Sequence, residues 1–100
     1  MLNIGKSTEN GKAVLTLDGR LDTVTAPEFD KTVREVLPGI TELKLDCGKL
    51  EYISSAGLRV LLTAQKIMNT QGEMKVCNVN ETVMEIFDVT GFTDILTIED

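Results

Sequence analysis

The sequence contains no histidine and no tryptophan, and only two of its 100 residues are cysteines. Zinc sites use cysteine and histidine in closely spaced sets, and Cys47 and Cys77 stand too far apart to begin one. The missing histidine also removes the side chain that most often serves as general acid or base near neutral pH. No paired carboxylates and no nucleophile–base pair stand out either. The sequence therefore predicts a protein that is not an enzyme and holds no metal.

Long apolar runs and basic clusters are also missing. The longest apolar stretches fall far short of the roughly 20 residues that span a membrane, and Met1–Gly11 lacks the apolar segment of a signal peptide. Ten basic residues against sixteen acidic ones give a net charge of −6, and an acidic surface repels nucleic acid and anionic lipid. We therefore expect a cytoplasmic protein that binds neither nucleic acid nor membrane. In the reducing cytosol its two cysteines are expected to be free thiols.

The rest of the composition is that of an ordinary globular domain. Hydrophobic residues make up 42% and charged residues 26% of a chain that is long enough for one core but not for two. No linker, internal repeat or low-complexity segment interrupts it. No P-loop or dinucleotide-binding fingerprint is present, so no cofactor is expected. The sequence predicts a single domain over residues 1–100.

Apolar periodicity predicts the order of the elements. Two alternating segments flank Asn10-Gly11, a pair typical of a tight hairpin turn, and residues 19–24 then form a connection. Further on, three segments with helical spacing alternate with short strand-like segments. We expect strands at 40–46, 73–79 and 95–98, helices at 25–37, 55–70 and 81–90, and a short loop at 48–52. The order β-β-α-β-α-β-α-β implies an α/β fold with parallel strands after the hairpin.

The segment from Tyr52 to Leu62 joins a strand end to the start of a helix. The first N–H groups of a helix are unpaired and its dipole is positive there, so a phosphate is favoured at that point. Ser54 and Ser55 both fall at this position, where serine commonly serves as an N-cap, and capping alone does not separate them. Gly57 would let another backbone approach closely.

Four short motifs together resemble one family. The run Ser55-Ala-Gly-Leu-Arg-Val-Leu-Leu62, which closes the segment from Asp46, resembles the STAS domain family and its anti-sigma factor antagonists. Three further motifs match in place and spacing: Gly19-Arg-Leu-Asp22 with Thr25-Ala26, Gly72-Glu-Met-Lys-Val-Cys77, and Phe87-x-x-x-Gly91. The resemblance covers nearly the whole chain. It implies a STAS-like mixed sheet of about four to five strands, mostly parallel at its centre, with helices packed against it.

The same resemblance implies a switch serine. The family pattern is Asp-Ser-(Ser/Ala)-Gly-Leu, and aligning Gly57-Leu58 places the phosphorylated serine on Ser55. Ser54 then stands where the family has aspartate, and is the less favoured second hydroxyl. Asp46, at the end of its strand, is expected either to hydrogen-bond this loop or simply to end the strand. The candidate partner-binding residues are Asp22, Thr25, Ser54, Ala56, Gly57 and Arg59.

Three of these candidates have a second interpretation. Asp22 either lines the partner-binding face or caps a loop turn. Thr25 is expected to be an N-cap more than a contact residue. Arg59 either reaches a phosphate or an acidic partner, or is simply solvated.

The family implies a function by partner switching. The unphosphorylated domain, a monomer when free, would bind an anti-sigma factor that is also a serine kinase and so release a sigma factor. Phosphorylation of Ser55 with ATP bound by the kinase would reverse this, and a metal-dependent serine/threonine phosphatase would reset it. Three alternatives stay open. The first is a STAS module that acts on a non-sigma partner, with or without phosphorylation. The other two are a small enzyme and a redox protein that uses Cys47 and Cys77.

Overall fold

A single five-stranded sheet organises residues 1–99, which are the residues that the computed structural model describes. The strands are β1 (Leu2–Glu9), β2 (Lys12–Leu21), β3 (Glu42–Ile53), β4 (Glu73–Cys77) and β5 (Ile98–Glu99), in that spatial order. The helices are α1 (Ala26–Val36), α2 (Ser55–Gln71) and α3 (Glu81–Thr90), with a 3₁₀ turn at Phe92–Asp94. β1 and β2 are antiparallel and the later pairs are parallel. The predicted element order and mixed sheet are thus confirmed.

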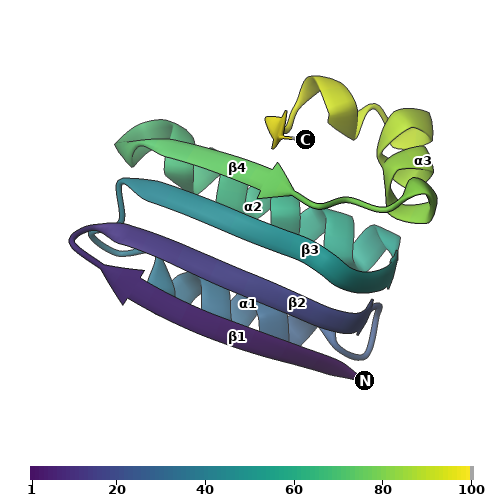
Figure 1. Cartoon of the computed structure of the whole chain (residues 1–100), viewed down its shortest axis with the longest axis horizontal. Helices are drawn as coiled ribbons and strands as arrows, with labels where there is room; N and C mark the ends of the chain where they lie inside the picture. Colours follow the sequence, from purple (N-terminus) through teal and green to yellow (C-terminus); the bar gives the residue numbers. More distant parts are fainter. Residues whose placement is uncertain (100) are drawn as a thin grey trace.

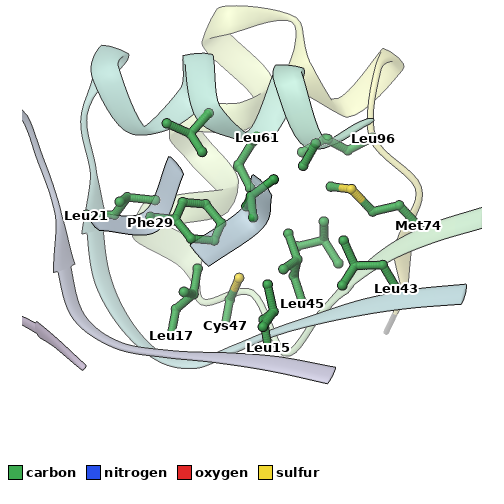
Figure 2. Close-up of a cluster of buried hydrophobic side chains, with 14 of the residues drawn as sticks. Leu15, Leu17, Leu21, Phe29, Leu43, Leu45, Cys47, Leu61, Met74 and Leu96 are labelled. Atoms are coloured by element: carbon green, nitrogen blue, oxygen red, sulfur yellow. The ribbon is translucent and has the colours of Figure 1, made fainter. Parts of the chain in front are cut away.

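The two long helices α1 and α2 lie side by side against one face of the sheet, and α3 lies at the end where β3 finishes (Figure 1). Leucines at alternate positions of β2 and β3 point toward Phe29 of α1 and Leu61 of α2, and together they fill the core (Figure 2). The other face of the sheet carries charged side chains, with Lys12 paired to Glu42 at 3.3 Å. No helix within residues 1–99 is long and apolar enough to cross a bilayer.

The hairpin turn forms where Asn10-Gly11 predicts it. Asn10 has φ 50° and Gly11 has φ 80°, the pair of positive values that a tight two-residue hairpin requires. Glycine adopts such values freely and asparagine tolerates them, which explains why these two residues mark the turn.

The ends of several strands differ from the prediction. The connection expected at residues 19–24 begins later, because β2 continues to Leu21, and the loop expected at 48–52 is part of β3. The pairing of β2 with β3 shifts register twice in this part, so the strict alternation of a strand is lost there. β4 ends at Cys77 rather than 79. The last strand, expected at 95–98, is shorter and lies later in the chain, at Ile98–Glu99.

Candidate functional site

Two loops meet at the end of the sheet where β2 and β3 finish. The Ser54 N–H donates a 2.8 Å hydrogen bond to the Leu21 carbonyl oxygen, which joins the start of α2 to the end of β2. The Arg20 guanidinium lies over the Tyr52 ring, 4.6 Å from its centre, and adds a second link between the strands. Because parallel strands end at the same edge, the β2–α1 loop and the N-terminus of α2 form one surface. We call this surface, residues 22–25 with Ser54–Arg59, the switch end.

The two adjacent serines have different surroundings. Ser54 is the N-cap of α2: its hydroxyl oxygen accepts from the Gly57 N–H at 3.4 Å and its carbonyl accepts from the Leu58 N–H at 2.9 Å. Ser55 is the first residue of the helix and its side chain is exposed. Within residues 1–99 no side chain hydrogen-bonds the Ser55 hydroxyl. Ser54 is therefore engaged in holding the helix start, whereas the hydroxyl of Ser55 is open to an incoming group.

Gly57 has an internal packing role. It is buried, and a Cβ placed on it would lie 2.6 Å from Leu21 Cγ and 2.9 Å from Ile53 Cγ1. The close approach expected at Gly57 is therefore made by side chains of this chain, not by another backbone. Neighbouring Ala56 is half-buried against the same core. These small residues let α2 start directly on the ends of β2 and β3, which fixes where Ser55 stands.

The loop after β2 is organised by Asp22 and Thr25. One carboxylate oxygen of Asp22 accepts from the backbone N–H groups of Val24 at 3.0 Å and Thr25 at 3.1 Å. These bonds, led by that from Thr25, hold the pKa of Asp22 below its ordinary value. The Thr25 hydroxyl donates to the Arg20 carbonyl at 2.8 Å and accepts from the Asp22 N–H at 2.9 Å. Thr25 stands at the N-cap position of α1 but makes no side-chain cap bond, so the predicted capping role is wrong.

Sequence reasoning missed Val24. Its side chain is 85% exposed, although its backbone N–H is held by Asp22. A β-branched side chain on an ordered loop has few rotamers to lose, so an apolar contact made through Val24 would cost little side-chain entropy. The signal in the sequence is a large apolar residue inside an otherwise polar loop segment, Asp22–Thr25.

Asp46 does not reach the serine loop. Its carboxylate accepts from the Gly48 N–H at 2.9 Å and from the Asn78 side-chain amide at 3.0 Å, and these bonds, that from Asn78 first, lower its pKa. Both interpretations offered for Asp46 are therefore wrong: it does not bond the Ser54–Ser55 loop, and it does not end the strand, because β3 continues to Ile53. The bond to Gly48 lies where β3 shifts register, so Asp46 holds the irregular part of the strand that leads to Ser54.

The two cysteines face opposite sides of the sheet. Cys47 points into the core (Figure 2), while Cys77 pairs in register with Asp46 and so shares the face of that aspartate. Burial raises the pKa of Cys47 to about 12 and also raises the pKa of Cys77. Both therefore stay thiols at neutral pH, which argues against a redox pair. Among the described residues no group of three or more Cys, Asp or Glu side chains is arranged to hold a metal ion.

Comparisons with known proteins agree on one family. The STAS domain model matches residues 3–100. The anti-sigma F factor antagonist of Paenibacillus polymyxa is 30% identical over 102 residues, which cover 99% of this chain and 87% of that relative. The structure of an anti-sigma factor antagonist from Mycobacterium paratuberculosis superposes with a TM-score of 0.89 at 19% identity, covering 98% of this chain and 85% of that one. The Bacillus cell fate determinant SpoIIAA in its phosphorylated form gives a TM-score of 0.74 at 14% identity, covering 100% and 92%.

Proposed function

This chain belongs to the STAS domain family, and we propose that it acts as an anti-sigma factor antagonist switched at Ser55. In its unphosphorylated form it binds an anti-sigma factor that is also a serine kinase, and this binding releases the sigma factor. Phosphorylation of Ser55 ends the binding, and a serine/threonine phosphatase restores it. The chain itself is not an enzyme in this scheme. It works in the cytoplasm as a monomer when free and contacts neither nucleic acid nor membrane.

The contrast between the two serines carries this proposal. The hydroxyl of Ser55 is exposed at a helix N-terminus, while that of Ser54 accepts the Gly57 N–H. A kinase needs a hydroxyl that it can reach without unfolding its substrate, and Ser55 meets this need. The family pattern points to the same serine. The relatives named anti-sigma factor antagonists support the partner class.

The chemistry of the switch is a phosphoryl transfer. The Ser55 hydroxyl oxygen forms a bond to the γ-phosphorus of ATP as the bond from that phosphorus to the β–γ bridging oxygen breaks, ADP leaves, and the hydroxyl proton passes to a base of the kinase. In the reverse arm, water attacks the phosphoserine phosphorus, inorganic phosphate leaves and the serine hydroxyl is restored. ATP is held by the kinase.

Electrostatics explains how a single phosphate can reverse binding. It adds a charge of about −1.5 to −2 near neutral pH, and at a helix N-terminus this charge is stabilising by about 0.3–2 kcal/mol. The domain therefore stays folded. In an interface, however, the same dianion costs several kcal/mol unless the partner pairs it. About 5.5 kcal/mol shifts an equilibrium from 99:1 to 1:99, so desolvation and steric exclusion at the switch end suffice without a change of fold.

The test is incubation with the cognate kinase and ATP, followed by intact mass and peptide mapping. Wild type and Ser54→Ala should each gain one phosphate, and Ser55→Ala should gain none. A phosphate mapped to Ser54 would contradict the assignment. Tight partner binding with neither serine modified would instead favour a STAS module that acts on a non-sigma partner.

A further inference from the structure

We propose that Arg59 binds the phosphate of Ser55 within the same chain once that serine is phosphorylated, and so holds the phosphorylated state. This inference rests on the proposed function, because it concerns the regulation of the same residue. It assigns to Arg59 a role that alternates between the two states of the switch.

Helix geometry places the two side chains together. Ser55 is the first residue of α2 and Arg59 stands four positions later, so the two are neighbours on one helix face, with Cβ atoms about 5–6 Å apart. Both are exposed. Side chains of a helix lean toward its N-terminus, so the long Arg59 side chain extends back over the turn that begins with Ser55.

Arg59 is also unengaged before phosphorylation. Arg34 pairs with Asp30 at 3.0 Å and Arg20 lies over the Tyr52 ring, whereas Arg59 makes no salt bridge with any residue of 1–99. The first turn of α2 carries no acidic residue that would compete for it. The guanidinium that lies nearest to Ser55 along the helix is therefore available.

A phosphate changes what Arg59 can bind. A serine hydroxyl offers a guanidinium little, but a dianionic phosphate accepts two parallel N–H bonds from it. An anion placed four residues before a cation is the favourable orientation of such a pair on a helix. Ser54, the neighbouring cap, is neutral and does not repel the phosphate. In the unphosphorylated state the exposed Arg59 guanidinium is accessible to solvent and to a binding partner. After phosphorylation it forms an ion pair with the phosphate.

The test uses phosphoserine encoded at position 55 during translation, so that no kinase is needed. The phosphate is titrated by phosphorus-31 NMR in the full chain. The midpoint of this phosphate titration should lie lower in wild type than in Arg59→Gln by about 0.2–0.4 pH units. This shift is the free energy of an i,i+4 ion pair expressed in pH units. Arg59→Lys keeps the charge but cannot donate two parallel N–H bonds, so its midpoint should fall between those of wild type and Arg59→Gln. Arg34→Gln on α1 is the matched control and should match wild type.

A second variant tests the effect of a negative charge at Ser54, next to the phosphate. Ser54→Asp keeps a good N-cap but places a carboxylate beside the phosphate, so its midpoint should rise above that of wild type. Equal midpoints for wild type and Arg59→Gln would overturn the proposal, whatever the kinase does. A wild-type chain that no kinase phosphorylates would overturn the proposed function while leaving the midpoint measurement intact.

Discussion

The two ends of the sheet use their polar groups in opposite ways. At the end where β2, β3 and β4 begin, the Gly11 carbonyl accepts the Thr41 N–H at 2.8 Å, and the Gln71 side-chain amide donates to the carbonyls of Leu37 at 2.6 Å and Ile40 at 2.7 Å. This end, which we call the turn end, ties its loops to one another. The switch end instead uses its hydrogen bonds to hold a loop and a helix start, from which the exposed residues Val24, Ser55 and Arg59 face solvent. One end closes the fold, and the other presents side chains on a rigid support.

The largest effect is expected from a mutation at Gly72, which tests whether the turn end is tightly packed. A Cβ there would overlap the Thr41 carbonyl oxygen, which is backbone and cannot rotate away. Gly72→Ala should therefore lower the free energy of unfolding by about 3 kcal/mol or more, measured by urea denaturation. Gly5→Ala is the control, because its Cβ would lie 3.4 Å from Thr16 Cβ, and its stability should stay near wild type. A Gly72→Ala protein as stable as wild type would show that the turn end is not tightly closed.

A smaller loss of stability is expected on mutating Asp46, which holds the irregular part of β3 that leads to the switch end. Its two hydrogen bonds lower the pKa, so the stabilisation they give is fully present above the unfolded-state value and is lost as pH falls through the lower folded value. Asp46→Ala should cost about 1 kcal/mol at pH 7. The difference from wild type should shrink below about pH 4. Urea denaturation across pH measures this, with Asp18→Ala in β2 as the control. A difference that does not depend on pH would contradict the role given to the carboxylate.

The smallest effect separates the two serines. Ser54→Ala removes the N-cap of α2 and should lower the free energy of unfolding by about 0.5–1 kcal/mol. Ser55→Ala removes an exposed hydroxyl without a partner and should change it by less than about 0.5 kcal/mol. Thermal unfolding of the two variants, each the control of the other, resolves the difference. Equal losses would mean that the structure does not distinguish the two hydroxyls.

The order of elements could be predicted because each depends on local signals. Asn10-Gly11 allows positive φ, Asn80 accepts the Val83 N–H at 2.8 Å as a cap, and Gly91 ends α3 in the left-handed conformation. None of these requires knowledge of a distant residue. The family resemblance added the STAS-like mixed sheet and the choice of Ser55.

The failures all involve partners that a sequence pattern does not identify, whether those partners are distant or only a few residues away. The segment 48–52 looks like a loop in sequence, but it pairs with the end of β2 across two register shifts and so forms part of β3. Thr25 looks like a cap because it precedes a helix, yet its hydroxyl is taken by the Arg20 carbonyl. Ser54 and Ser55 look alike until the hydrogen bond to Gly57 is seen. A sequence pattern reports which residue types favour a local conformation, and it does not report which partner a polar group finally finds.

The position of the first residue has a practical consequence for any assay of this chain. The Met1 carbonyl accepts the Arg20 N–H at 3.2 Å, so the N-terminus lies at the same end as Ser55 (Figure 1). A purification tag or fluorophore attached there would stand beside the switch end, and a loss of binding that it caused would look like the effect of a mutation in that surface. A label in the Asn10-Gly11 hairpin turn, at the far end of the sheet, keeps that approach clear.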